Sequence, residues 1–324
     1  MADNVQLSSK PSSFQAVFAL DLITSAIALA FLALATKPTF VRIKRRRFST
    51  PGRDRGAPLK TTLGTYLFLY PGLFCFFLAY TLTWVADLLK SSGSINYNGE
   101  MQLHGRFPVS NTSFQRSSAI LSWTVALASI FFTALINGGV WIYSSHLLAN
   151  GTFKKSPSTI SRIWNTFIIS AILATGLAAW GLGMSHRSSG TTWSDAVYDN
   201  STTRALFVAY RAVVIGASLS VSFETLWNYF DVNSNSSKDS SERPHLARFT
   251  FVVVPMIWLR NAFIIYDIVL IYLDSAGWST TTKLASRFLL IIFGQFVNLT
   301  ILGMILWGAW KTGRTVRIFE QGKT

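Results

Sequence analysis

The chain contains little cysteine, little histidine and few charged residues for its length. Its 324 residues include one cysteine, Cys75, so no disulfide can form within the chain. The four histidines are scattered and form no Cys/His cluster of zinc-site spacing, and we predict neither a metal nor another cofactor. Charged residues make up 13% of the sequence, whereas a soluble domain carries about 25%. This deficit indicates a membrane protein.

Long apolar runs are the main feature that the sequence does have. Hydrophobic residues make up 50% of the chain, and its mean hydropathy is +0.36. Seven runs are long enough to cross a bilayer as helices, which takes roughly 20 residues each. They cover 14–35, 62–86, 119–143, 163–183, 205–230, 249–273 and 288–309. We therefore predict an all-α, multi-pass membrane protein, with a seven-helix transmembrane domain over 14–309, an N-terminal tail over 1–13 and a basic tail over 310–324.

Basic residues lie mainly on one side of these runs. The loops and tail on that side carry 19 Lys and Arg, and those on the other side carry eight. The positive-inside rule then places the N-terminus in the lumen or outside and the C-terminus in the cytosol. The basic cluster Lys44–Arg47 is interpreted as a topology signal beside anionic membrane lipids, and no nucleic-acid partner is predicted. We expect the protein to lie in the membrane of the endoplasmic reticulum rather than in the plasma membrane. Asn111 and Asn200 are the predicted glycosylation sites, in lumenal loops. The oligomeric state is left open.

Polar residues interrupt the run 249–273. Arg260, Asn261 and Asp267 lie in its interior, where an ionised side chain costs about 2.5–3.5 kcal/mol on insertion scales. Arg260 and Asp267 are seven residues apart and therefore share one helix face. We expect this face to line a cavity inside the bundle. Arg260, near the midplane, would then meet Glu224, Asp267 or a ligand anion.

Four polar residues fall at a similar depth in different runs. Asp21, Arg211, Asp267 and Gln295 each lie roughly 10 Å from the lumenal end of their run at the helical rise per residue. One interpretation is an Asp–Arg–Asp bridge that locks three helices, because buried charges are usually paired. The other is a cavity in which one carboxyl stays unpaired and exchanges a proton. Two acids against one base leave an odd acid, which favours the second interpretation.

Glu224 lies nearer the cytosolic end of its run. Ser220 and Asn228 are one turn away along its face, and Trp227 is close by in the sequence. Three interpretations stay open for the carboxyl: a hydrogen-bonded tie between helices, a general acid, and a surface group that extends to the interface.

Several familiar heptahelical classes fit poorly. The third run leads into WIYSSHLL, without the acidic-Arg-aromatic triplet of the common receptor class, and the last run lacks the Asn-Pro turn of that class. The last run also has no lysine that would bind retinal as a Schiff base. No repeated filter or ring of polar residues indicates a channel.

The seven spans, short loops, Trp-rich helices and isolated intramembrane carboxyls resemble the small heptahelical membrane proteins of fungal genomes. These include the membrane-bound terpene cyclases of meroterpenoid and indole-diterpene pathways, and the resemblance covers residues 14–309 in architecture. It implies an enzyme whose intramembrane Glu and Asp protonate an epoxide or alkene of a lipid-soluble polyprenyl substrate. Glu224 and Asp267 would take this part, with Asp21 as a third candidate. The substrate-binding candidates are Arg260, Arg211, Asn261, Trp227, Trp258 and Tyr266.

Two functions therefore remain open. The first is an integral-membrane cyclase that acts on a lipophilic, epoxy-prenylated intermediate within the bilayer. The second is a non-enzymatic heptahelical receptor or sensor.

Overall fold

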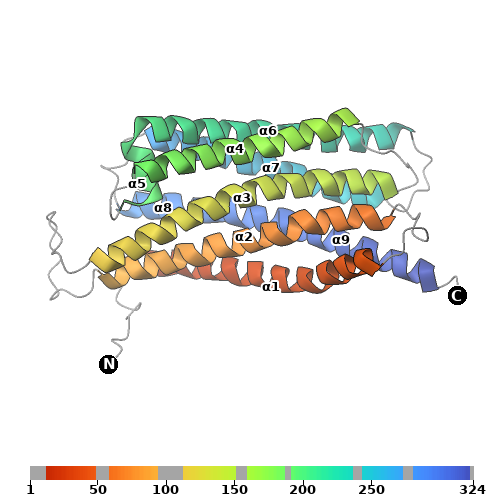
Figure 1. The fold of residues 1–324 in the computed structure, drawn as a ribbon, viewed down its shortest axis with the longest axis horizontal. Helices are drawn as coiled ribbons and strands as arrows, with labels where there is room; N and C mark the ends of the chain where they lie inside the picture. Colours follow the sequence, from red (N-terminus) through yellow and green to blue (C-terminus); the bar gives the residue numbers. More distant parts are fainter. Residues whose placement is uncertain are drawn as a thin grey trace, which may run out of the picture.

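The computed structural model describes residues 12–48, 58–93, 112–150, 159–186, 191–235, 243–272 and 280–321. These residues form helices and short connections, and no strand occurs among them. The helices are α1 (Ser12–Phe48), α2 (Pro58–Gly93), α3 (Thr112–Asn150), α4 (Thr159–Ser185), α5 (Trp193–Asp199), α6 (Ser201–Asn235), α7 (Arg243–Tyr272), α8 (Thr280–Leu290), the π-helix η4 (Ile291–Phe296) and α9 (Val297–Gln321) (Figure 1). The predicted all-α fold is confirmed.

Among the described residues, seven helical stretches are long and apolar enough to cross a membrane, and they coincide with the seven predicted runs. They are Gln15–Val41, Gly64–Ala86, Arg116–Ser145, Thr159–Ser185, Ser201–Asp231, Leu246–Tyr272 and Ala285–Lys311. The last stretch is one continuous rod formed by α8, η4 and α9. The chain is therefore a multi-pass membrane protein.

The helical conformation satisfies polar groups that the bilayer would otherwise leave without partners. Backbone amides bond within each helix, and many hydroxyls donate to the carbonyl four residues earlier. Thr24, Ser25 and Thr39 of α1 do so at 2.9, 3.1 and 2.6 Å. These small polar residues therefore need no partner on another helix.

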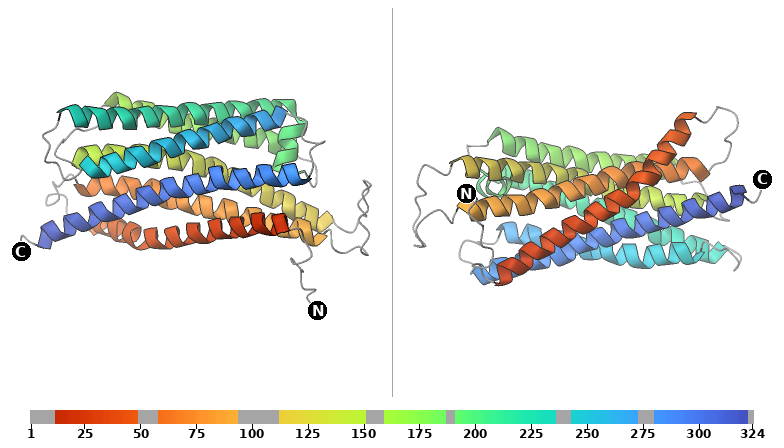
Figure 2. Two further views of the ribbon diagram at one scale, coloured as in Figure 1. Left: turned by 180° about the vertical axis from the view of Figure 1, so that it is seen from behind. Right: turned by 90° about the horizontal axis from the view of Figure 1, so that it is seen from below.

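The long helices pack in a closed ring. Each of α1, α2, α3, α4, α6, α7 and α9 contacts the next, and α9 returns to α1. Figure 1 shows α4 and α6 along one side of the bundle and α1 along the opposite side. The short helix α5 lies at one end, which we call the α5 end, and the C-terminus lies at the other (Figures 1 and 2).

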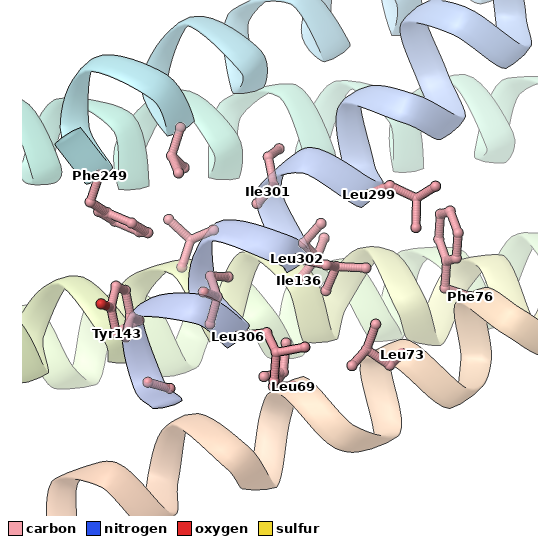
Figure 3. Close-up of a cluster of buried hydrophobic side chains, with 14 of the residues drawn as sticks. Leu69, Leu73, Phe76, Ile136, Tyr143, Phe249, Leu299, Ile301, Leu302 and Leu306 are labelled. Atoms are coloured by element: carbon pink, nitrogen blue, oxygen red, sulfur yellow. The ribbon is translucent and has the colours of Figure 1, made fainter. Parts of the chain in front are cut away.

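A large apolar core fills the half of the bundle away from α5. It joins the first half of α2, the second half of α3, the first half of α7 and most of α9. Leu69 and Leu73 of α2 pack there with Ile136 of α3 and with Leu302 and Leu306 of α9 (Figure 3). Leu69, Leu73, Ile136 and Leu302 are among the most deeply buried side chains of the described residues, so this half of the bundle is closely packed.

A second apolar core lies between α3, α4, α5, α6 and α7 on the other side of the ring. Neither core includes a buried residue of η4, of α1 before Ala28 or of α2 after Phe76, among the residues that the structure describes. In the α5 half, the interior beside α1 and η4 instead holds buried polar side chains, including Asp21 and Gln295.

Hydrogen bonds fix the short helix α5 at its end of the bundle. Thr192 and Asp195 form a capping box at its start. The Trp123 indole of α3 donates to the Thr191 carbonyl at 2.9 Å, and its ring lies 5.3 Å from that of Trp193. Asn200 follows α5 and caps α6, because its Oδ1 accepts from the backbone amides of residues 202 and 203.

Candidate functional site

Five helical elements bring charged and amide side chains together in the α5 half of the bundle. We call this set the polar layer: Asp21 of α1, Arg211 of α6, Arg260, Asn261 and Asp267 of α7, Arg287 of α8 and Gln295 of η4. It includes four of the predicted catalytic and binding residues on α6 and α7, and Asp21. It does not include Glu224.

Asp21 is bound from the last transmembrane rod. It is 1% exposed, and it accepts from Gln295 Nε2 at 2.9 Å and from Arg287 Nη2 at 3.1 Å. In an unbroken α-helix, residues 287 and 295 would point roughly 80° apart around the axis. The wider turns of η4 reduce this angle, so both side chains reach Asp21. The π-helix η4 therefore allows Arg287 and Gln295 to bind the same carboxylate.

Arg211 pairs with Asp267 across the α6–α7 interface. Its Nη2 donates to Oδ2 of Asp267 at 2.8 Å, and its guanidinium lies 4.8 Å from the centre of the Phe207 ring. The Asp–Arg–Asp bridge, one of the two interpretations of these residues, is therefore wrong, because Arg287 rather than Arg211 pairs with Asp21. Sequence depth alone does not give the angular position of a side chain around the ring, and Arg287 lies just outside the predicted run.

Two tyrosines show where the ion pairs lie relative to α2 and α5. Tyr80 of α2 lies within electrostatic range of both Asp21 and Arg211, so the two pairs border a common interior region. Tyr198 lies outside the membrane spans on α5. Partial burial, followed by the negative charge of Asp267, raises the pKa of its phenol. Helix α5 therefore lies close to the Arg211–Asp267 pair.

Arg260 is the most unusual group of the layer. It is 6% exposed, and its Nη2 donates to Asn137 Oδ1 at 3.1 Å and to Ser218 Oγ at 2.6 Å. Both acceptors are neutral. Among the described residues, no carboxylate lies within 4 Å of its guanidinium, and its Nε is buried without a partner. The two protein partners expected for Arg260, Glu224 and Asp267, therefore do not meet it.

Asn261 is buried next to Arg260 on α7. It is 4% exposed, and neither its Oδ1 nor its Nδ2 has a hydrogen-bond partner in the described part of the chain. Phe263 stacks on Phe293 at 4.9 Å, which places Asn261 near the level of Gln295 on the antiparallel rod. The Oε1 of Gln295 is also without a partner. A buried polar group left unpaired costs about 1–3 kcal/mol, so such a group calls for an explanation.

The polar layer carries an excess of positive charge. Its three guanidiniums, those of Arg211, Arg260 and Arg287, face two carboxylates, those of Asp21 and Asp267. Each carboxylate is already paired with one arginine. The predicted odd acid is therefore wrong, and the odd charge is the cation of Arg260.

Glu224 lies outside this layer and joins α6 to α4. It accepts from Ser161 Oγ at 2.6 Å and from Asn165 Nδ2 at 2.8 Å. One turn away, the Trp164 indole donates to Ser220 Oγ at 3.0 Å. Of the three interpretations left open for Glu224, this geometry matches the hydrogen-bonded tie between helices.

The predicted aromatic residues divide between the outside and the inside of the bundle. Trp227 is 73% exposed and Trp258 is 46% exposed, so both lie on the outer surface. Tyr266 is partly buried, and its hydroxyl donates to Ser286 of α8 at 3.2 Å, next to Arg287. Of the three, Tyr266 is the one that borders the polar layer.

The remaining predicted sites are placed as follows. Asn111 lies outside the described residues. The Oδ1 of Asn200 is engaged in capping α6, and glycosylation there stays a prediction. In the described part of the chain, no group of three or more His, Cys, Asp or Glu residues is placed to hold a metal ion.

Four residues that complete the site were not predicted from the sequence. Arg287 lies just before the last apolar run, and Tyr80 resembles any interfacial aromatic. Asn137 and Ser218 are neutral polar residues within apolar runs, and their polarity inside those runs could have marked them as candidate site residues. Comparison with protein-family models, with curated proteins and with solved structures finds no significant match to this chain.

Proposed function

We propose that the protein is a heptahelical receptor or sensor that binds a lipophilic ligand in the polar layer. The observation that carries this proposal is the asymmetry of the interior. The charged side chains and buried amides of the polar layer lie in the α5 half, whereas a large apolar core fills the opposite half. The positive-inside rule makes the α5 end lumenal or external, so the ligand enters from that side or from the adjoining leaflet. We place the protein in the endoplasmic reticulum.

Helix α7 supports a signalling role because it belongs to both halves. It carries Arg260, Asn261 and Asp267 in the polar layer, and its first half packs in the large apolar core with α9. A ligand that contacts the polar layer differently in two arrangements of α7 shifts the population between them. The cytosolic loops 144–162 and 231–248, part of which lies outside the described residues, would present the change to a partner.

The test measures bound molecules and helix movement in the same preparation. The full-length protein, purified from its own membranes, is analysed by native mass spectrometry for a co-purifying lipophilic molecule. We expect one that is released chemically unchanged and that is lost in the variant Asn261→Leu. The distance between spin labels at the cytosolic ends of α6 and α7 should change when the molecule is added back. A protein that carries no such molecule, or shows no distance change on adding it, would refute the receptor function.

The terpene cyclase stays as a second candidate because aromatic rings lie near the ion pairs. Phe207 and Tyr210 lie against the Arg211 guanidinium, and Phe263 and Phe293 stack one turn from Asp267. Such rings stabilise a carbocation. The carboxylates support it less well, because Glu224, Asp267 and Asp21 each accept hydrogen bonds from protein side chains. An acid catalyst would first have to leave these partners.

The cyclase is tested with epoxy-prenylated substrates and product analysis. It predicts that Glu224→Gln or Asp267→Asn abolishes cyclised product while the protein still inserts and accumulates. Full turnover by both variants would exclude carboxyl-initiated cyclisation. No conversion of any such substrate by the wild-type protein would favour the receptor.

A further inference from the structure

We infer that the polar layer binds the anionic head of an amphipathic acid, a carboxylate, at Arg260 and Asn261. This inference rests on the proposed function, because it names the chemical class of the ligand that the receptor binds. Four properties of the described residues carry it: the charge, the hydrogen-bonding atoms without partners, the fixed position of the guanidinium and the apolar surroundings.

The first property is the charge of the layer. Two arginines are neutralised by Asp267 and Asp21, and Arg260 is left with the neutral acceptors Asn137 and Ser218. A buried charge without a counter-ion is costly, so such residues usually mark a functional site. The excess is one positive charge, which a carboxylate neutralises. A phosphate monoester carries about −1.5 to −2 at neutral pH and would leave an excess of negative charge.

The second property is the set of unused atoms. Arg260 Nε, Asn261 Nδ2 and Asn261 Oδ1 are all buried and have no partner in the described part of the chain. Guanidinium and amide N–H groups are donors that a carboxylate accepts from, and bonds to charged groups are the stronger ones. Arg260 and Asn261 are consecutive on α7, so one head group contacts a single helix.

The third property is how the guanidinium is held in place. Asn137 of α3 and Ser218 of α6 accept from the same atom, Nη2, which fixes the guanidinium from two other helices. Asn137 is itself held, because its Nδ2 donates to the Thr133 carbonyl at 2.8 Å. The Nε edge of Arg260 is therefore held in a fixed position and has no acceptor in the described part of the chain. A pre-organised donor of this kind lowers the entropic cost of binding.

The fourth property is an apolar surface for the chain of the acid. Phe263 and Phe293 stack at the interface of α7 with η4, within one turn of Asn261 toward the α5 end, and both are partly exposed. An alkyl or prenyl tail packed against these rings would leave the layer toward the bilayer, while its carboxylate stays buried. The two parts of the ligand thus match the two kinds of surface.

The test uses three photoactivatable probes with one long alkyl chain and three heads: a carboxylate, an alcohol and a quaternary ammonium. The full-length protein in neutral-lipid nanodiscs is labelled, the labelled residues are located by mass spectrometry, and dissociation constants come from competition with unlabelled compounds. An unlabelled alkyl phosphate of the same chain serves as a fourth competitor. Arg260→Gln is compared with Arg248→Gln, an exposed arginine on the same helix but at its opposite end.

We expect the carboxylate to label α7 or η4 and to bind at least about tenfold more tightly than the alcohol, because a hydrogen bond to a charged group has that effect on affinity. The ammonium and the phosphate should bind more weakly than the carboxylate. Arg260→Gln should reduce carboxylate binding to the level of the alcohol, and Arg248→Gln should leave it unchanged.

A second variant keeps the test independent of the buried cation. Asn261→Leu retains Arg260 and removes only an amide without partners, so we expect weaker carboxylate binding together with a higher melting temperature. Lower stability with unchanged carboxylate binding would overturn the inference. Equal binding of carboxylate and alcohol, both insensitive to Arg260→Gln, would overturn the anionic head while the proposed ligand binding stands. Labelling of neither α7 nor η4 by any probe would overturn both.

Discussion

Replacement of Arg260 by methionine is expected to stabilise the ligand-free protein. The substitution removes a buried cation that has no carboxylate partner among the described residues, and it leaves the groups around it satisfied. The single proton of the Ser218 hydroxyl lies within reach of the Val214 carbonyl at 2.7 Å and of Asn137 Oδ1 at 3.1 Å. In the variant it donates to Asn137 Oδ1, because the Val214 carbonyl keeps its backbone bond within α6. The unbranched methionine side chain fills most of the space that the arginine stem occupied.

The magnitude follows from two opposing terms. An arginine at the centre of a membrane helix costs about 2.5–3.5 kcal/mol on insertion scales. The two bonds from Nη2 to Asn137 and Ser218 are lost, and interhelical hydrogen bonds in membranes contribute roughly 0.6 kcal/mol each on average. The difference favours Arg260→Met by on the order of 1–2 kcal/mol. For a domain of roughly 300 residues, the unfolding entropy per residue converts each kcal/mol into a shift of the melting temperature of about 1.5–2 °C.

Cys75 provides the assay, since it is the single cysteine of the chain. It lies half-buried on α2 against the large apolar core, and a fluorogenic maleimide will report its exposure as the protein is heated in detergent. Arg248→Met is the control, and an exposed substitution should change stability by no more than about 0.5 kcal/mol. If Arg260→Met instead lowers the melting temperature while Arg248→Met does not, Arg260 stabilises the fold without a ligand, and the argument for a ligand site fails.

The same thermal assay checks three further predictions. Gly176→Ala should destabilise the protein by about 1–3 kcal/mol, because a Cβ there would lie 2.7 Å from Ile130. Gly181→Ala on the same helix meets open space and should stabilise the protein by roughly 0.8–1 kcal/mol. Equal effects of the two substitutions would contradict the packing of α4 against α3. A double-mutant cycle of Glu224→Gln and Asn165→Leu should give a coupling of about 0.6–1.7 kcal/mol if Glu224 ties α4 to α6, and a coupling near zero would remove that role. Arg287→Gln should lower the melting temperature more than Arg211→Gln does. Arg287→Gln removes the cation beside the fully buried Asp21, whereas Asp267, the partner of Arg211, is 32% exposed. The reverse order of the two variants would contradict the pairing of Arg287 with Asp21.

The sequence was sufficient to predict the seven spans and the all-α class. A helix in lipid must be apolar along its whole length, so each span is visible as a run of residues such as 119–143 without reference to its neighbours. Depth in the membrane also follows from position along a run. It placed Asp21, Arg211 and Asp267 near one level, and the contacts of the polar layer are consistent with that level.

Partners within the bundle were decided only by the tertiary structure. Depth is one coordinate, and pairing also requires the angle of each side chain around its helix and the order of the helices in the ring. The π-helix η4 changes that angle for Gln295, and the closing contact of α9 with α1 brings Arg287 to Asp21 across 266 residues of chain. Arg211 thereby pairs with Asp267 alone, and the unpaired charge of the layer is a cation rather than an acid.

The run 249–273 shows both contributions together. The sequence by itself determined that this span is a membrane helix with a polar face that needs partners, because Arg260, Asn261 and Asp267 are too costly for a lipid-facing helix. The tertiary structure decided which of these three side chains has a partner. Among the described residues, Asp267 pairs with Arg211, Arg260 has neutral acceptors from α3 and α6, and Asn261 has no partner.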